Sequence, residues 1–329
     1  MKITYGCLLA LALLTGCMPI NYPPGEKTTA ARLQYNQFIT EDGAHLPLRQ
    51  WLPKTEVEAI IIALHGFNDY SAFFHAPASY LSQQGIACFA YDQRGFGLAP
   101  QRGLWAGEDA YSADLNSLVR LIKQRYPHRP VYLLGESMGG AVIMNAMDDT
   151  SRADVAGIIL AAPALWARST MPWYQTGLLW VMAHSLPWLN LTGKGIKVTP
   201  SDNIPMLRAL GKDPLVIKAT RVETLYGLAN LMDTAFASAN TLTNNTLLLY
   251  GEKDDIIPKQ PTYTFLRTFL AADTAQKTVA FYPQGYHLLL RDLQAMTVWQ
   301  DIVAWVRNKK SALPSGADNR AKQLLAEIN

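Results

Sequence analysis

Residues 131–140 read VYLLGESMGG, and this stretch decides the fold class of the 329-residue chain. Four apolar residues that suit a strand are followed by Gly135, and the small residues Gly139 and Gly140 begin a helical pattern. A turn this sharp between a strand and a helix forces its central residue, Ser137, into a strained conformation and requires small neighbours on both sides. The pattern therefore predicts a strand, a tight turn and a helix, with the hydroxyl of Ser137 raised above a sheet.

The chemistry of this turn depends on the group that follows the serine. The backbone N–H of Met138 is expected at the N-terminus of the helix, where it would stabilise negative charge beside the hydroxyl of Ser137. The pattern thus indicates a nucleophilic serine. The alternative is a tight turn in which Ser137 does no more than cap the helix.

Apolar runs comparable to residues 131–134 recur along the chain and alternate with helical patterns. The runs are residues 59–64, 87–91, 155–160, 246–250 and 278–282, and two of the helical patterns are residues 111–126 and 140–147. Continuous apolar runs are typical of strands buried on both faces of a sheet. A hairpin is predicted for residues 35–53, around Glu41-Asp42-Gly43. The sequence therefore predicts an α/β fold with a mostly parallel, doubly wound sheet that is covered by helices on both faces.

The alternation breaks after the sixth predicted strand, where helical patterning continues for about eighty residues without a convincing strand. We predict that residues 166–243 form a helical cap, inserted between the sixth and seventh strands of a core made of residues 35–165 and 244–308. Pro172 and Pro187 argue against a membrane span in this apolar segment. Four of the chain's eight tryptophans lie in the cap, namely Trp166, Trp173, Trp180 and Trp188. Two readings stay open and are compatible: helices that pack on the core, and helices that line an apolar pocket.

Composition and charge exclude several classes of protein. The chain has 29 basic and 26 acidic side chains, a formal charge of +3, so no basic surface for nucleic acid is indicated. Its mean hydropathy is near zero, which excludes a protein built of several membrane spans. Three cysteines cannot form a disulfide scaffold, and six histidines without HExxH or CxxC spacing give no metal site. We expect no metal, no cofactor and no nucleic-acid partner.

The first residues have the pattern of an export signal. Lys2 precedes an apolar core at residues 7–14, and small residues then lead to Cys17. The run Leu14-Thr15-Gly16-Cys17 resembles a bacterial lipobox, in which the cysteine becomes the lipidated first residue of the mature protein. We therefore expect a signal peptide at residues 1–16 and a lipidated Cys17 that holds the protein at a membrane surface. The alternative is an ordinary cleaved signal in which Cys17 is incidental.

The segments that flank the core have polar, flexible compositions. Residues 17–34 contain proline, glycine and threonine with few apolar side chains, so we expect a tether between the lipid and the folded domain. Residues 309–329 are expected to form a C-terminal tail with a short peripheral helix. Met18, rather than an aspartate, follows Cys17, which in a Gram-negative cell indicates the outer membrane.

Two polar residues follow the last two predicted strands, in a position to activate Ser137. Asp254 follows the strand at residues 246–250, and His287 follows the strand at residues 278–282. A serine hydroxyl becomes nucleophilic when a histidine removes its proton, and an acid orients the imidazole and stabilises its charged form. All three residues fall in loops after strands, where open α/β sheets place their sites. The order Ser, Asp, His along the chain predicts a catalytic triad of Ser137, Asp254 and His287.

With these residues the chain resembles the α/β-hydrolases, and within them the monoacylglycerol lipase and lysophospholipase-like group of the serine aminopeptidase S33 type. The resemblance extends over residues 35–307, and the residues that carry it are His65-Gly66, 135–140, 251–254 and His287. It implies that the acid is Asp254 rather than Asp255. It also implies that the backbone N–H of Phe67 joins that of Met138 in an oxyanion hole.

The resemblance gives expectations for three further residues and for the reaction. His65 is expected to orient the oxyanion loop, and Asp92 to be structural; Glu136 is a departure, since many relatives have histidine there. The sequence thus predicts a serine hydrolase that acts on carboxylic esters of lipids with one acyl chain. The alternatives are an esterase or aminopeptidase-type hydrolase of small non-lipid substrates, and a non-catalytic, surface-anchored binding protein, which the complete triad argues against.

Overall fold

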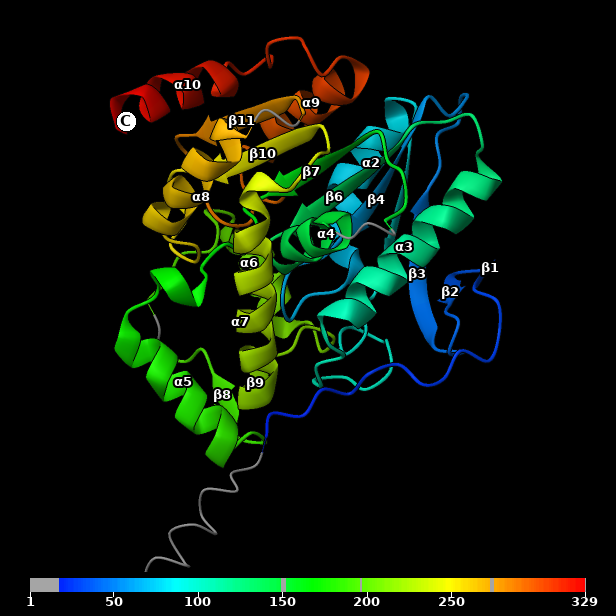
Figure 1. Ribbon diagram of the computed structural model, residues 1–329. Coiled ribbons are helices and arrows are strands. Elements are labelled where there is room, and N and C mark those ends of the chain that lie inside the picture. The colour runs from blue at the N-terminus through cyan, green and yellow to red at the C-terminus, as the bar shows by residue number, and fades with distance from the viewer. Residues whose placement is uncertain (1–17, 149–151, 196, 273–274, 329) are drawn as a thin grey trace, which may run out of the picture.

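The structure, a computed structural model, describes residues 18–148, 152–195, 197–272 and 275–328 (Figure 1). Within them nine strands form one sheet, in the order β1-β2-β3-β5-β4-β6-β7-β10-β11. These strands are β1 (Arg32–Gln34), β2 (Gln37–Ile39), β3 (His45–Trp51), β4 (Ala59–Leu64), β5 (Ile86–Tyr91), β6 (Val131–Glu136), β7 (Gly157–Ala161), β10 (Thr246–Gly251) and β11 (Lys277–Tyr282). The strands from β5 to β11 in this order are parallel, and β1, β2 and β3 extend one edge in antiparallel pairs. The predicted α/β fold with a mostly parallel sheet is confirmed.

Helices cover both faces of the sheet, and β4 shows why. Ile60 and Ile62 pack into one hydrophobic cluster, whereas Ile61 and Ala63 pack into the other, because successive side chains of a strand point to opposite faces. The helices of the first cluster include α3 (Glu108–Arg125), α4 (Met138–Asp148) and α8 (Lys259–Ala271), and those of the second include α2 (His75–Gln83) and α9 (Ala295–Arg307). The sheet is therefore buried on both sides, as its apolar strands require.

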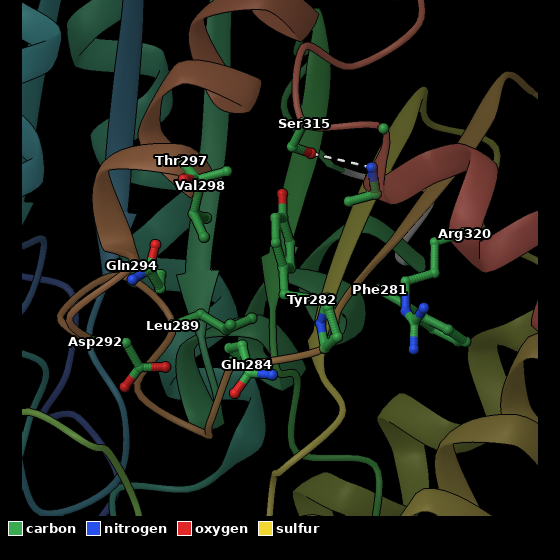
Figure 2. A pocket seen from close by; sticks show the side chains of 14 residues that line it. Phe281, Tyr282, Gln284, Leu289, Asp292, Gln294, Thr297, Val298, Ser315 and Arg320 are labelled. Carbon is green, nitrogen blue, oxygen red and sulfur yellow. Dashed lines mark hydrogen bonds between the residues drawn. The ribbon is translucent and has the colours of Figure 1, made fainter.

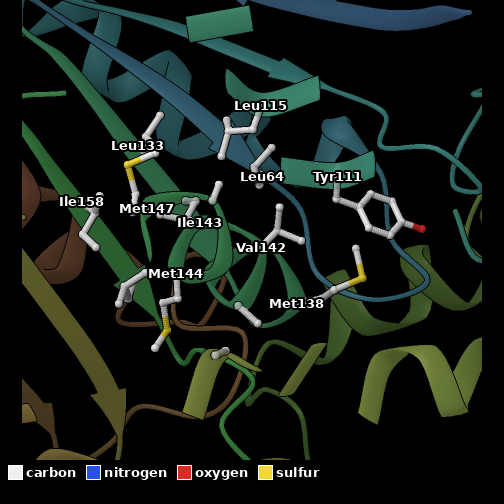
Figure 3. Packing of buried hydrophobic residues seen from close by; sticks show 14 of the residues in the cluster. Leu64, Tyr111, Leu115, Leu133, Met138, Val142, Ile143, Met144, Met147 and Ile158 are labelled. Atoms are coloured by element: carbon white, nitrogen blue, oxygen red, sulfur yellow. The ribbon is translucent and has the colours of Figure 1, made fainter. Parts of the chain in front are cut away.

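Helix α4 is the most deeply packed of these helices and follows directly on the strand β6. Figure 3 shows Val142, Ile143 and Met147 of α4 among the buried side chains Leu133 of β6 and Leu115 of α3. All of these side chains are wholly buried. The dense packing fixes the first turn of α4, and with it the position of Ser137 just before the helix.

The insertion between β7 and β10 forms a cap that contains two short strands as well as helices. Its main elements are α5 (Trp173–Ser185), β8 (Asn190–Thr192), α6 (Ile204–Lys212), β9 (Ala219–Arg221) and α7 (Val222–Ala237). Strands β8 and β9 pair in an antiparallel ribbon, so the prediction that this segment has no strand is wrong. A strand of three residues is too short to produce the alternation by which strands are recognised in a sequence. Strand β1 was not predicted either. The insertion therefore follows the seventh strand of the sheet, and the prediction that it follows the sixth is corrected.

The cap tryptophans do not behave as a packed helical face. Trp166 packs against the core, but Trp173 is 84% exposed and Trp180 and Trp188 are about half exposed. The expectation of ordinary packing is therefore wrong for these three residues. Helix α5 begins only after Pro172, so the seven-residue spacing from Trp166 does not continue on one helix. No helix of the described residues is both long and apolar enough to span a bilayer.

The segment before the core is attached to the fold, which corrects the expected tether. Tyr22 donates a backbone hydrogen bond of 2.7 Å to Trp105, and Thr28 donates one of 2.9 Å to Glu41. Strand β1, within the expected tether, pairs with β2. The prediction of a flexible tether is therefore wrong for residues 22–34. The expected signal peptide at residues 1–16 and Cys17 lie outside the described residues.

The C-terminal segment is also part of the fold. Helix α10 (Ala317–Ile328) lies along β11 at the edge of the sheet (Figure 1). Ala321 of this helix is buried in the first hydrophobic cluster, and Arg320 forms an ion pair with Glu252. The expectation of a peripheral tail at residues 309–329 is therefore wrong, because α10 covers the apolar surface beside the last strand.

Candidate active site

Ser137 stands on a strained turn between β6 and α4. Its backbone has a φ of +53°, which is uncommon for a residue with a side chain. The two flanking glycines make this turn possible: a Cβ on Gly135 would lie 2.4 Å from the backbone of Gly139, and a Cβ on Gly139 would lie 2.3 Å from the carbonyl oxygen of Leu64. The structure thus has the turn predicted from the sequence, with a partly exposed serine at its centre.

His287 and Asp254 lie in contact on the loops that follow β11 and β10. The Nδ1 atom of His287 is 2.8 Å from Oδ2 of Asp254. The other oxygen of Asp254 accepts the backbone N–H groups of Ile256 and Ile257, at 2.8 and 2.9 Å, which fixes the carboxylate. Asp255, the alternative acid, is exposed. The geometry therefore selects Asp254 as the partner of His287.

The surroundings of His287 favour its protonated form. Burial by itself lowers the pKa of His287, but the charge of Asp254 and the hydrogen bond to it, with a contribution from Glu136, outweigh burial and raise the pKa. An imidazole in this setting accepts a proton readily while its ring is held in one orientation. These are the properties of a general base.

The loop that follows β4 lies beside Ser137 and contains Phe67. A Cβ on Gly66 would be in van der Waals contact, at 3.4 Å, with the Cβ of Ser137. His65 fixes this loop from inside, because its Nδ1 atom donates to the carbonyl of Gly66 (2.9 Å) and its Nε2 atom accepts the N–H of Gln93 (3.0 Å). Burial lowers the pKa of His65, which is consistent with the neutral ring that this pair of bonds requires. His65 thus holds the loop in the way expected of it.

Asp92 has a structural role, as expected. One of its carboxylate oxygens accepts both the N–H (3.0 Å) and the hydroxyl (2.5 Å) of Ser71, and the other accepts the N–H of Leu98 (2.9 Å). A Cβ on Gly97 would lie 2.3 Å from this carboxylate, so glycine is required there. Asp92 therefore ties two loops together beneath the site.

A buried cluster of three charged residues joins the loops of the site, and little in the sequence indicated it. Nη2 of Arg291 lies 2.8 Å from Oε2 of Glu136 and 2.8 Å from Oδ2 of Asp69. Glu136 precedes Ser137, Asp69 is two residues after Phe67, and Arg291 is four residues after His287. The sequence marked Glu136 as a departure from the family pattern, but nothing in it connected that residue to Arg291.

The loop of His287 is also joined to the cap, at the segment just before α6. We call residues 200–203 and 288–293 together the cap seam. Its hydrogen bonds run from the N–H of Leu288 to the carbonyl of Pro200 (2.9 Å), from the hydroxyl of Ser201 to Asp292 (2.5 Å), from the N–H of Leu293 to Asp202 (2.9 Å) and from the amide of Asn203 to the carbonyl of Arg291 (2.9 Å). The cap is therefore fastened to the loop that carries the imidazole.

A cavity of about 310 Å³ lies behind this loop and is separate from the site (Figure 2). Its lining includes Tyr282, Leu289, Val298 and Ser315, from β11, the loop after it, α9 and the segment before α10. Ser137 and His287 do not line it, so we do not assign it to the reaction. Among the described residues, no group of three or more His, Cys, Asp or Glu side chains is arranged to hold a metal ion.

Comparison with known proteins identifies the class to which this fold and site belong. The profile of the family "Serine aminopeptidase, S33" matches residues 55–294, which is most of the chain. The protein therefore belongs to this family of α/β-hydrolases.

Within the family, the most informative relatives are monoglyceride lipases. The chain is 27% identical to a human protein named monoglyceride lipase over 284 residues, 83% of this chain and 90% of that one. It is 23% identical to the monoacylglycerol lipase of Mycolicibacterium smegmatis over 279 residues, 82% of this chain and 96% of that one. Among solved structures, the monoglyceride lipase of Saccharomyces cerevisiae in complex with a substrate analog has a TM-score of 0.70 at 21% identity, over 88% of this chain and 99% of that one. The protein is a monoglyceride lipase-like serine hydrolase of carboxylic esters.

Proposed function

We propose that this protein hydrolyses carboxylic esters of lipids with one acyl chain, with Ser137 as nucleophile, His287 as general base and Asp254 as the acid that orients it. The observation that carries this proposal is the contact of His287 with Asp254 at the carboxyl end of the parallel strands, where Ser137 lies on its strained turn. A nucleophile on such a turn, together with an imidazole and a carboxylate on later loops, is the arrangement of an acyl-transfer site.

The reaction follows from these roles. The oxygen of Ser137 attacks the ester carbonyl while His287 takes its proton, and the carbonyl oxygen becomes an oxyanion. The backbone N–H groups of Phe67 and Met138 stabilise that oxyanion, and the loss of one such donor costs about 3 kcal/mol in other hydrolases. His287 then protonates the leaving alcohol, which leaves an acyl-enzyme. Water, deprotonated by His287, attacks the acyl group and releases the free acid and Ser137.

The choice of a lipid substrate is supported by the relatives and by the surface of the cap. The human and mycobacterial relatives are named monoglyceride or monoacylglycerol lipases. The cap exposes large apolar side chains, among them Trp173 (84%), Leu178 (63%) and Trp180 (54%). Contiguous exposed apolar surface on a protein marks a site of contact with a partner or a membrane. A lipid-water interface is the place where such a substrate is found.

We further propose that a lipid on Cys17 holds the protein at a membrane, in a Gram-negative host the outer membrane. The described chain begins at Met18, and Tyr22 is hydrogen-bonded to Trp105, whose ring lies against Gly227 of α7 in the cap. In Figure 1 this start of the chain, in dark blue, is at the cap end of the molecule. Exposed cations accompany the apolar surface of the cap, namely Lys194, Lys197, Arg208 and Lys212. Aromatic and cationic side chains together suit the surface of an anionic bilayer.

A substrate panel tests the proposed activity. It contains p-nitrophenyl esters of increasing acyl length, a monoacylglycerol, a lysophospholipid and a proline-terminated dipeptide amide. We expect the highest kcat/KM for medium or long single-chain esters, and a loss of nearly all turnover in Ser137→Ala. A preference for the acetate ester or the amide would instead establish the small-substrate esterase or aminopeptidase. Failure of a fluorophosphonate to label the wild-type protein would favour the non-catalytic binding protein.

A further inference from the structure

The buried cluster beneath Ser137 contains more negative than positive charge. The side chains of Glu136, Asp69 and Arg291 are each at most 9% exposed, and both carboxylates contact the same Nη2 atom of Arg291. A single guanidinium therefore forms ion pairs with two carboxylates. With all three groups ionised, the cluster has a net charge of −1 in a part of the protein from which water is largely excluded.

The cluster is poorly suited to a purely stabilising role. Oε1 of Glu136 and Nε of Arg291 have no hydrogen-bond partner in the described part of the chain, although both atoms are buried. Buried polar atoms without partners destabilise a fold, and buried ion pairs in general contribute little net stability. A cluster with these defects, placed directly beside the reacting residues, points to a function in the reaction.

The residue that the cluster can influence most is His287. This imidazole is buried, and it must acquire a positive charge when it takes the proton of Ser137. The charged groups that act on it are Asp254, in direct contact, then Glu136, which favours its charged form, and Arg291, which opposes it. The pKa of Glu136 is itself raised, because burial outweighs the opposing effect of the adjacent Arg291. Asp69 contacts the same arginine from the loop after β4 and does not adjoin Ser137 in the chain.

We propose that Glu136, held by Arg291, is a second carboxylate of the active site that stabilises the imidazolium of His287 through space. This inference rests on the proposed role of His287 as the base. Glu136 acts through His287 and touches no reacting atom, so it is a positioning residue and not a catalytic one. Glu136 lies directly before the nucleophile, at the end of a wholly buried strand, and its contact with Arg291 joins it to the loop that carries His287.

The test compares Glu136→Gln with Asp69→Asn, which removes the same charge from the same arginine. The measurement is the pH dependence of fluorophosphonate labelling of Ser137 in the full-length protein, over about pH 5 to 9 around the titration of histidine. A base must be neutral to act, so the acid limb of this profile reports the pKa of His287. Loss of the negative charge of Glu136 lowers that pKa, so the acid limb of Glu136→Gln should move about 0.5 unit to lower pH. The maximal rate of fluorophosphonate labelling of Glu136→Gln should fall about fivefold.

Two further variants make the outcome decisive. Asp69→Asn should leave the acid limb in place, and Glu136→Asp, which keeps the charge, should have its acid limb close to the wild-type position. An unchanged limb in Glu136→Gln, or an equal shift in Asp69→Asn, would overturn the inference, since the cluster would then act by packing alone. Wild-type protein that is not labelled, or labelling that survives Ser137→Ala, would contradict the proposed function itself.

Discussion

The strand β4 and the helix α5 are both strongly apolar, yet their side chains have opposite environments. All six residues of β4 are buried, whereas Ala183 is the single buried residue among the thirteen of α5, all of which the structure describes. The strand has covering helices on both faces, and its apolar side chains stabilise the fold. Apart from Leu179, which packs against the core, and the buried Ala183, the apolar side chains of α5 contribute little to folding because they remain largely in water. Apolar sequence therefore stabilises the fold in the core, whereas in the cap it is left exposed, where the proposed contact with lipid would use it.

The largest expected effect separates the chemistry of the core from the cap. Ser137→Ala should reduce kcat on a water-soluble ester by a factor on the order of 10⁵, because Ser137 is the proposed nucleophile. Trp180→Ala, on the exposed face of α5, should change that rate by less than about threefold. Steady-state kinetics with p-nitrophenyl butyrate would measure both. Comparable losses in the two variants would show that the cap takes part in the chemistry.

Removal of the proposed anchor should separate the cap's surface contact from lipid attachment. Cys17→Ser should transfer the protein from the membrane fraction to a soluble or unprocessed form, because each buried CH₂ of an acyl chain contributes about 0.8 kcal/mol. Cell fractionation followed by immunoblotting measures the distribution, with Cys88→Ser as a matched control at a buried cysteine. Unchanged fractionation of Cys17→Ser would eliminate the anchor.

A pair of leucine substitutions tests the difference in stability directly. Leu247→Ala, in the buried strand β10, should lower the free energy of unfolding by about 3 kcal/mol, since it leaves a cavity in the core. Leu178→Ala, in α5, should lower it by less than about 0.5 kcal/mol. Urea denaturation of both variants gives the comparison. A large loss in Leu178→Ala would mean that α5 is packed in solution.

The smallest expected effect concerns contact with lipid. Leu178→Ser should weaken binding of the unlipidated protein to anionic vesicles about fivefold, because the side chain would lose its contact with the acyl region. Leu270→Ser, at an exposed leucine of α8 outside the cap, is the matched control and should leave binding unchanged. Vesicle co-sedimentation measures the affinity. Equal losses in the two variants would remove the cap as the contacting surface.

The sequence predicted the core well because its strands are continuous apolar runs, which indicate burial on both faces of a sheet. Residues 59–64 form β4 with the predicted bounds, and the serine turn lies where its glycines indicated. The short strands β1, β8 and β9 were missed, since three residues give no period to detect. The contact between Glu136 and Arg291 joins residues 155 positions apart, and no local sequence pattern predicts such a pair. Apolarity likewise could not distinguish the buried β4 from the exposed α5, because burial depends on what the fold brings to each face.

The cap seam has a mechanical consequence. Residues 200–203 are hydrogen-bonded to the loop that holds the imidazole, so a displacement of the cap at this point would be transmitted to the loop of His287. For protein engineering, this divides the cap into parts that are exchangeable and parts that are not. A chimera that replaces α5 keeps the geometry of the base, whereas one that crosses residues 200–203 must carry the matching segment 288–293 with it.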